Sequence, residues 1–292
     1  MSWLNGLEHV VREAEPLAPW NCFRLGGAAE YFAEPTNVDE LAQLVRRCHA
    51  DGMPLRLLGA GSNILVSDEG VKGVVIHLAA PAFCAIQPHK NEIVAGAGAK
   101  LNHVVATAAR EGLAGLEALV GIPGTVGGAV RGNATGHGAS IGEWTDGARV
   151  MTRTGEINSL ARGELRFRHR ESNLDDLLVL EATFSLEPGD ASQLTRMMQK
   201  LWIVKRLSQP TGDLGNGRIF ADPRGMTAAE IIEQAGLKGA TVGGAIVSDR
   251  NANFIEAQPG ATSKDVQALI DLVRRRVSEK LGVDLVPEIE IW

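Results

Sequence analysis

Two glycine-rich loops are the first places in this sequence where chemistry can be expected. The first covers residues 59–63, with the sequence Gly-Ala-Gly-Ser-Asn, and the second covers residues 121–128, with the sequence Gly-Ile-Pro-Gly-Thr-Val-Gly-Gly. Glycine lets the backbone approach a ligand closely, and backbone amides together with a Ser or Thr hydroxyl can donate hydrogen bonds to phosphate oxygens. The two loops together predict a bound cofactor that contains a diphosphate.

The first loop departs from the glycine fingerprint of Rossmann folds. Ile64 stands where that fingerprint has its third glycine, and no long helical pattern follows. Taken alone, the loop is equally well explained as a glycine turn between two strands. The second loop favours a cofactor, because in a chain of net charge −6 backbone amides rather than cationic side chains would meet a diphosphate.

A series of motifs then gives the chain a specific resemblance. The motifs are residues 21–27, 58–65, 115–117, 121–129, 236–239, 243–248, 252–255 and 287–288. In composition and order they resemble the MurB family, the UDP-N-acetylenolpyruvoylglucosamine reductases. The resemblance covers nearly the whole chain. It implies an α+β protein with an FAD-binding fold of the vanillyl-alcohol-oxidase type, followed by a C-terminal α+β domain that closes over a UDP-sugar.

The resemblance also implies a reaction and a cofactor set. MurB enzymes pass a hydride from NADPH to FAD and from the flavin to an enolpyruvyl group, during peptidoglycan synthesis. The FAD would be noncovalent, since neither His nor Cys lies inside the first loop to attach it. The residues that would bind FAD are Gly59, Ala60, Gly61, Ser62, Asn63, Gly121, Ile122, Gly124, Thr125, Gly127, Gly128 and Asn133.

Catalytic and substrate-binding residues follow from the same resemblance. Arg170 and Ser172 match the family's Tyr-Arg-x-Ser segment, whose arginine stabilises an enolate-like intermediate through its permanent charge. Glu288 matches a C-terminal glutamate that assists protonation. Ser172, Asp222 and Asn253 are assigned to the substrate. The competing interpretations are a solvated surface arginine at position 170 and a glutamate at a strand edge at position 288.

Position 218 departs from the family's catalytic pattern. The family has Gly-Ser-x-Phe-Lys-Asn-Pro, in which the serine donates a proton, and this chain has Gly-Arg-Ile-Phe-Ala-Asp-Pro at 217–223. Arg218 therefore occupies the catalytic donor position. A guanidinium with a pKa above about 12 holds its proton too tightly to act as a general acid at neutral pH.

Further departures cluster on the substrate side. Asp222 stands where the family has a neutral contact to UDP, and it would repel a diphosphate unless Arg218 or Arg224 compensates its charge. Two classes of function stay open. One is a MurB reductase with another proton source, such as water, His137 or His169. The other is a MurB-like flavoprotein whose activity is lost or changed.

The pattern of apolar residues places these motifs on three domains, at 1–80, 81–188 and 189–292. The first two would be α/β flavin-binding subdomains and the third the substrate domain, with Pro188-Gly189 at its start. The expected strands are 31–34, 55–58, 73–78, 92–95, 147–152, 178–186 and 286–292. The expected helices are 37–48, 102–111, 191–207, 227–236 and 263–281. Asn37 is expected to be the N-cap of the first of these helices. The apolar face of the last helix is expected to comprise Val266, Leu269, Ile270, Val273 and Val277.

Composition excludes several other classes of protein. A pI of 5.7 argues against a broad nucleic-acid-binding surface. The three cysteines are widely spaced and form no C-x-x-C pair, so neither a disulfide framework nor a metal site is expected. The N-terminus does not look like a signal peptide, and no apolar run is long enough to span a membrane. A cytoplasmic protein is therefore expected, and no oligomeric state is predicted.

Overall fold

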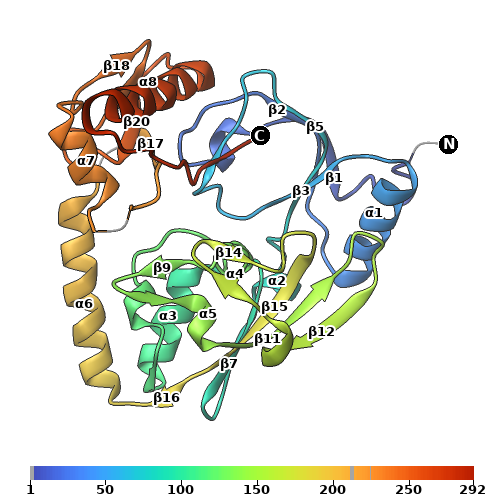
Figure 1. Cartoon of the computed structure of the whole chain (residues 1–292). Coiled ribbons are helices and arrows are strands. Elements are labelled where there is room, and N and C mark those ends of the chain that lie inside the picture. Colours follow the sequence, from blue (N-terminus) through green and yellow to red (C-terminus); the bar gives the residue numbers. More distant parts are fainter. Residues whose placement is uncertain (1–2, 211–213, 224) are drawn as a thin grey trace. The chain divides into compact units, whose positions relative to one another are not determined.

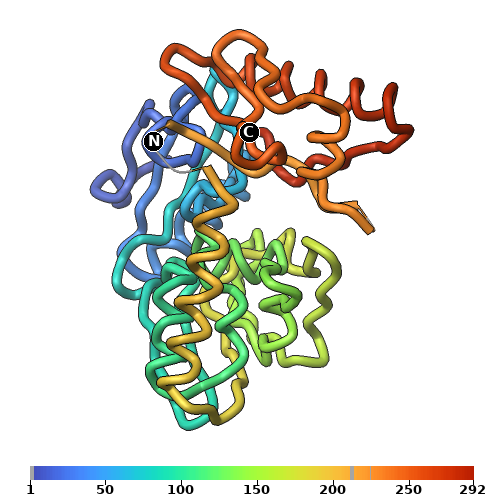
Figure 2. The backbone as a smooth tube through the Cα atoms, turned by 90° about the vertical axis from the view of Figure 1, so that its left-hand side faces the viewer, coloured from blue at the N-terminus to red at the C-terminus, as the bar shows by residue number. Residues whose placement is uncertain are grey.

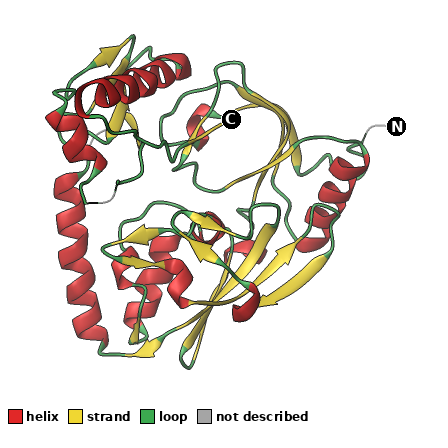
Figure 3. Cartoon of the chain, in the orientation of Figure 1, coloured by secondary structure: helices red, strands yellow, loops and turns green. Residues whose placement is uncertain are grey.

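The computed structural model describes residues 3–210, 214–223 and 225–292, and it mixes helices and strands as the α+β expectation requires (Figures 1 and 3). The described chain forms two compact units, each made of three segments that are far apart in sequence. Unit 1 contains Met1–Glu13, Tyr31–Ala60 and Lys72–Val204, and unit 2 contains Ala14–Glu30, Gly61–Val71 and Lys205–Trp292. The three domain boundaries expected from the sequence stay a prediction.

A four-stranded sheet of order β1-β2-β5-β3 is formed by the first part of the chain. Its strands are β1 (Val11–Pro16), β2 (Ala28–Ala33), β3 (Leu55–Leu58) and β5 (Val71–His77). Helix α1 (Val38–Ala50) leads from β2 to β3, and Asn37 caps it by accepting a hydrogen bond of 3.0 Å from the Glu40 amide. The N-cap predicted at Asn37 is therefore confirmed.

A five-stranded sheet lies wholly within unit 1, with the strand order β12-β11-β15-β7-β6, and all neighbouring strands in it are antiparallel. Its strands are β6 (Ile86–His89), β7 (Glu92–Gly96), β11 (Thr145–Met151), β12 (Ile157–Ala161) and β15 (Leu178–Ser185). Helices α3 (Leu101–Arg110) and α4 (Val126–Arg131) contact this sheet. Two shorter helices are α2 (Pro81–Cys84) and α5 (Ile141–Trp144).

Three strands of these sheets were absent from the expectation, and they share one property. β1, β6 and β12 lie at sheet edges, and most of their residues are exposed. A strand without a buried face carries no alternation of apolar and polar residues, which is the signal used to find strands in sequence. The predicted strands and helices of unit 1 agree with observed elements to within a few residues.

Unit 2 has a four-stranded sheet of order β17-β20-β19-β18 and its own apolar core. Its strands are β17 (Gly215–Arg218), β18 (Thr241–Val242), β19 (Ala245–Val247) and β20 (Phe254–Ala257), and its helices are α7 (Ala228–Gln234) and α8 (Ser263–Leu281). The five residues expected on the apolar face of α8 are all buried. Phe23 and Leu65, from the two N-terminal segments, complete this core at 1% exposure each.

The expected strand at 286–292 is largely wrong. Only β21 (Glu290–Ile291) is a strand, and it pairs in parallel with β4 (Ile64–Leu65), which is itself two residues long. Proline has no amide proton to donate, so Pro287 limits a ladder in this segment.

Helix α6 (Ala191–Ser208), expected at 191–207, is one continuous helix (Figure 2).

The remaining described elements are short strand pairs and 3-10 turns. The two-stranded pairs are β8 (Leu113–Ala114) with β16 (Glu187–Pro188), β9 (Thr135–Gly136) with β10 (Ala139–Ser140), and β13 (Phe167–Arg168) with β14 (Glu171–Ser172). Three 3-10 turns lie at Ala18–Trp20, Glu117–Leu119 and Arg162–Glu164.

Candidate functional site

The start of the first glycine loop contacts the second glycine loop within unit 1. Gly59 directly follows β3, and a Cβ atom placed on it would lie 2.7 Å from the Thr125 hydroxyl oxygen. A side chain at position 59 would force Thr125 to shift, which favours glycine there. The structure therefore brings together two loops that are more than sixty positions apart in the sequence.

The second loop leads directly into α4. Gly121 and Gly124 have φ values of 73° and 142°, which L side chains rarely adopt. Thr125 is the N-cap of α4, and its hydroxyl oxygen accepts a hydrogen bond from the Gly128 amide at 3.4 Å. Asn102 accepts a hydrogen bond from the Gly121 amide at 2.9 Å and so fixes the start of the loop.

Gly59 and Ala60 of the first loop and the whole of the second loop lie in unit 1, and their composition suits the diphosphate of a flavin dinucleotide. Glycine at position 59 leaves room for the Thr125 hydroxyl, and the positive φ values of Gly121 and Gly124 favour glycine at both positions. A bound anion at such loops is stabilised by backbone amides rather than by cationic side chains. The assignment of Gly59, Ala60 and the 121–128 loop to FAD stays a prediction.

The second half of the first loop belongs to unit 2. Gly61 has a φ of 61°, and a Cβ atom on it would lie 2.0 Å from the Trp20 carbonyl oxygen. The Asn63 side-chain amide donates a hydrogen bond of 2.8 Å to the Glu288 carbonyl oxygen. Asn63, assigned to FAD from the sequence, thus holds the backbone of a residue assigned to catalysis. Ser62 also lies in this segment, and the assignment of both residues to FAD stays a prediction.

Arg170 lies at the tip of a short hairpin in unit 1. β13 and β14 pair with Phe167 opposite Ser172 and Arg168 opposite Glu171, so His169 and Arg170 form the turn. Arg170 has a φ of 60°, a strained conformation for a residue other than glycine. Non-glycine residues with such backbone are found disproportionately at functional sites. Asn133 and His137, both named from the sequence, share this property with φ values of 42° and 48°.

The side chains of Asn133 and Ser172 are buried and form hydrogen bonds with other residues of the protein. Asn133 is 5% exposed, donates a hydrogen bond of 2.7 Å to the Arg168 carbonyl oxygen and accepts one of 3.0 Å from the Gly142 amide. Ser172 is 8% exposed and donates a hydrogen bond of 2.7 Å to the Arg131 carbonyl oxygen. Their assignments to FAD and to the substrate stay predictions.

In unit 2, Arg218 pairs with Asp222, as the sequence suggested, and also with Glu288. Its guanidinium lies 2.7 Å from the Asp222 carboxylate and 3.5 Å from that of Glu288. The other Asp222 oxygen accepts a hydrogen bond of 2.9 Å from the Ala228 amide at the start of α7. Arg218 therefore compensates the charge of Asp222, one of the two possibilities raised above. Arg224, the other, lies outside the described residues.

The buried side chain of Asn253 forms two hydrogen bonds with the backbone of Phe220. Its side chain accepts a hydrogen bond of 2.8 Å from the Phe220 amide and donates one of 2.8 Å to the Phe220 carbonyl oxygen. It is 3% exposed. These bonds hold the segment between Arg218 and Asp222 against β20. Its predicted contact with the substrate is not tested by this geometry.

The cysteines are poor candidates for covalent attachment of a flavin. All three are free thiols. Burial raises the pKa of Cys22 to about 11 and, together with the charge of Asp51, that of Cys48 to about 11, and burial also raises the pKa of Cys84. A thiol with a raised pKa is protonated at neutral pH and is a weak nucleophile.

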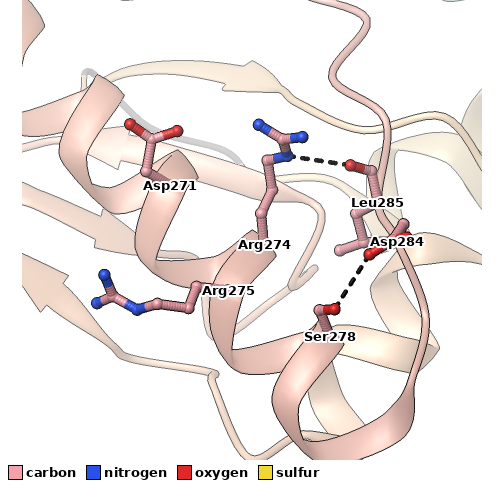
Figure 4. A pocket seen from close by; sticks show the side chains of 6 residues that line it. All are labelled: Asp271, Arg274, Arg275, Ser278, Asp284 and Leu285. Carbon is pink, nitrogen blue, oxygen red and sulfur yellow. Dashed lines mark hydrogen bonds between the residues drawn. The ribbon is translucent and has the colours of Figure 1, made fainter.

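One surface hollow of unit 2 is lined by none of these residues. It has a volume of ≈ 280 Å³ and lies beside α8 (Figure 4). It is lined by Asp271, Arg274, Arg275, Ser278, Asp284 and Leu285. Arg274 donates to the Leu285 carbonyl oxygen at 3.2 Å and Ser278 donates to Asp284 at 3.1 Å. The charges of both signs in this lining give it no preference for an anionic ligand.

Within 3–210, 214–223 and 225–292, no group of three or more His, Cys, Asp or Glu side chains is arranged to hold a metal ion. In the same part of the chain, no helix has the length and apolar character needed to cross a membrane.

Gly142 is a contributor to the site that the sequence did not indicate. A Cβ atom on Gly142 would lie 2.4 Å from the Phe167 ring and 2.7 Å from the Asn133 side-chain oxygen. Its amide is the donor to that same oxygen. The only signal in the sequence is the glycine itself, and glycines are too frequent in this chain for one to be singled out.

Comparisons with known proteins match both the loops and the C-terminal segment. The FAD binding domain family matches residues 29–161, and the C-terminal domain of UDP-N-acetylenolpyruvoylglucosamine reductase matches residues 209–292. The reductase of that name from Rhodopirellula baltica is 40% identical over 98% of this chain and 94% of its own length. The Listeria monocytogenes reductase is 38% identical over 97% and 95%. The crystal structure of MurB from Thermus caldophilus has a TM-score of 0.82 at 34% identity, over 97% of this chain and 99% of that one.

Proposed function

Because the chain belongs to the MurB family of UDP-N-acetylenolpyruvoylglucosamine reductases and has an FAD-binding domain, we propose that it reduces UDP-N-acetylglucosamine enolpyruvate to UDP-N-acetylmuramate. NADPH is the hydride donor in this proposal, and the reaction serves peptidoglycan synthesis in the cytoplasm. The observation that carries the proposal is the contact between Gly59 and Thr125, which joins two family motifs. Gly59, Ala60 and the 121–128 loop together are called the glycine cradle. This cradle suits the diphosphate of FAD.

The reaction adds one hydride and one proton across the carbon–carbon double bond of the enolpyruvyl group, and NADPH becomes NADP⁺. Bound FAD supplies the transfer of the hydride from NADPH to the enolpyruvyl carbon. Arg170 stabilises the negative charge that develops on the substrate, because its guanidinium stays protonated and can donate several hydrogen bonds. Glu288 assists delivery of the proton, and its backbone is held by Asn63.

Anaerobic stopped-flow absorbance tests this function. The purified protein is mixed first with NADPH and then with UDP-N-acetylglucosamine enolpyruvate, so that reduction and reoxidation of the flavin are measured separately. Both steps should occur, and UDP-N-acetylmuramate should form in an amount equal to the NADPH consumed. Reduction by NADPH without reoxidation by the enolpyruvyl compound would mean that the substrate is a different one.

The cofactor itself gives a first prediction. We expect the purified protein to be yellow with noncovalent FAD, because Cys22, Cys48 and Cys84 are protonated thiols and the first loop contains no His or Cys. After acid precipitation the flavin should appear in the supernatant. Flavin that stays with the precipitate would contradict the noncovalent state, and an apoprotein that takes up no FAD would remove the basis of the proposal.

Position 218 gives a second prediction. We expect slow reoxidation of the flavin by the enolpyruvyl substrate in the unmodified protein and a faster rate in Arg218→Ser combined with Asp222→Asn. Serine supplies a hydroxyl donor, and a positioned donor contributes about 10²- to 10⁴-fold. The second substitution is needed because Arg218→Ser alone removes the cation that pairs with Asp222 and Glu288.

The matched control for this pair is Arg218→Ala combined with Asp222→Asn. It removes the same charges but supplies no hydroxyl, so it should not share the gain in rate. Single-turnover reoxidation is compared in the three proteins, with product quantified to exclude oxygen as the acceptor. If the unmodified protein already turns over at about 1 to 10³ per second, the usual range for enzymes, then Arg218 does not impair the reaction.

A further inference from the structure

Two hydrogen bonds from buried side chains join the hairpin that carries Arg170 to neighbouring residues of unit 1. One is the hydrogen bond from Asn133 to the Arg168 carbonyl oxygen, at 2.7 Å, and the other is the bond from Ser172 to the Arg131 carbonyl oxygen, also at 2.7 Å. Arg168 and Ser172 lie on opposite strands of the hairpin. The two bonds therefore hold both strands that support the Arg170 turn.

Both attachment points lie at the C-terminal end of one short helix. Arg131 is the last residue of α4, and Asn133 follows it after Gly132. The N-terminal end of α4 is Thr125, the residue that meets Gly59. A single helix of six residues thus connects the glycine cradle to the Arg170 hairpin.

The hairpin needs such attachments because it cannot hold its own geometry. Two paired residues on each strand form a ladder that is too short to be stable in water by itself. Its turn also contains Arg170 in a left-handed backbone conformation, which persists only when the surrounding structure imposes it. Both bonds are made by side chains less than a tenth exposed, where solvent competes little for their polar atoms.

From these contacts we propose that Asn133 and Ser172 are positioning residues that fix the Arg170 guanidinium relative to the cofactor loops. The inference rests on the proposed function of Arg170. It changes the role expected for Ser172 from a contact with the substrate to an indirect one, through the hairpin. Small displacements of a catalytic group are costly, up to about a hundredfold in rate for a shift of about 1 Å.

The test is a double-mutant cycle between Ser172→Ala and Arg170→Ala. In a background with Arg170 present, Ser172→Ala should slow flavin reoxidation by the enolpyruvyl substrate by about tenfold or more, mainly through kcat. In the Arg170→Ala background it should have almost no further effect, because groups that act as a unit are not additive. Ser172→Thr keeps the hydroxyl and should restore most of the rate.

Three readouts separate positioning from general damage to the protein. FAD affinity by fluorescence titration and the rate of reduction by NADPH should be unchanged in Ser172→Ala. Thr145→Val is the matched control, because the Thr145 hydroxyl donates a buried bond of 2.8 Å to the carbonyl oxygen of Ile141, a residue outside the hairpin. It should lower the melting temperature without slowing reoxidation. Asn133→Ala should behave like Ser172→Ala whenever its FAD affinity is intact.

The possible failures can be told apart. If Arg170→Ala leaves reoxidation unchanged, the proposed role of Arg170 is wrong and the positioning inference fails with it. If Arg170→Ala slows reoxidation but Ser172→Ala does not, only the inference is overturned. A further loss caused by Ser172→Ala in the Arg170→Ala background would also overturn it, since Ser172 would then act independently of Arg170.

Discussion

Gly124→Asp is expected to lower FAD affinity by at least about a hundredfold while leaving a folded protein. Gly124 has a φ of 142°, and a side chain there strains the loop by about 1–3 kcal/mol. The added carboxylate also repels a diphosphate by roughly 1–4 kcal/mol at a separation of about 4 Å near a protein surface. Each 1.4 kcal/mol that reaches the binding equilibrium changes affinity by about tenfold.

Gly52→Asp is the matched control for this loss. Gly52 also has a positive φ, 63°, and space around it, but it precedes β3 whereas Gly59 follows β3. Gly52 therefore lies at the opposite end of β3 from Gly59, the residue that contacts the loop of Gly124. Equilibrium titration of apoprotein with FAD is compared in the two variants, with circular dichroism to verify folding. Equal FAD affinity in folded Gly124→Asp and Gly52→Asp would place the cofactor elsewhere.

Arg170→Ala is expected to slow reoxidation of the flavin by the enolpyruvyl substrate by about 10²- to 10³-fold, the usual effect of removing one donor to a developing oxyanion. Reduction of the flavin by NADPH should be nearly unchanged, because that step develops no charge on the enolpyruvyl group. Arg170→Lys keeps the charge but loses the planar fork of donors, so its reoxidation rate should lie between those of the unmodified protein and Arg170→Ala.

Arg166→Ala provides the control for the loss of positive charge. Arg166 is exposed and precedes β13, so its removal changes the net charge near the hairpin by the same amount. Stopped-flow traces of both half-reactions are recorded for each variant. A similar loss of rate in Arg166→Ala and Arg170→Ala would indicate a general electrostatic effect, and a solvated Arg170 would then be the better interpretation.

Local patterns in the sequence predict much of this fold. The helix at 263–281 is found with its observed bounds because its apolar face is regular, and the helix after Asn37 starts where a capping residue indicates it. The pairing of Arg218 with Asp222 could also be anticipated, since the two lie four positions apart and have opposite charges. Such features depend on residues close together in the chain.

The rest depends on contacts between distant residues, which periodicity does not encode. Asn133 lies 35 positions from Arg168, and Asn63 lies 225 positions from Glu288. Asparagine in a loop is compatible with many roles, so its partner cannot be named from the sequence. For the same reason, the strand expected at 286–292 is too long, because its partner β4 has only two residues and lies more than two hundred positions earlier in the chain.

The composition of the unit 2 core also has a consequence for the order of events during synthesis. Phe23 and Leu65 belong to that core, but the first strand of its sheet begins at Gly215, 150 positions after Leu65 (215 minus 65). A ribosome adds about 5–20 residues per second. Phe23 and Leu65 are therefore synthesised on the order of ten seconds before the residues of the unit 2 sheet that bury them. Unit 2 therefore cannot fold as the chain emerges, and its early segments need shelter from aggregation until translation is nearly complete.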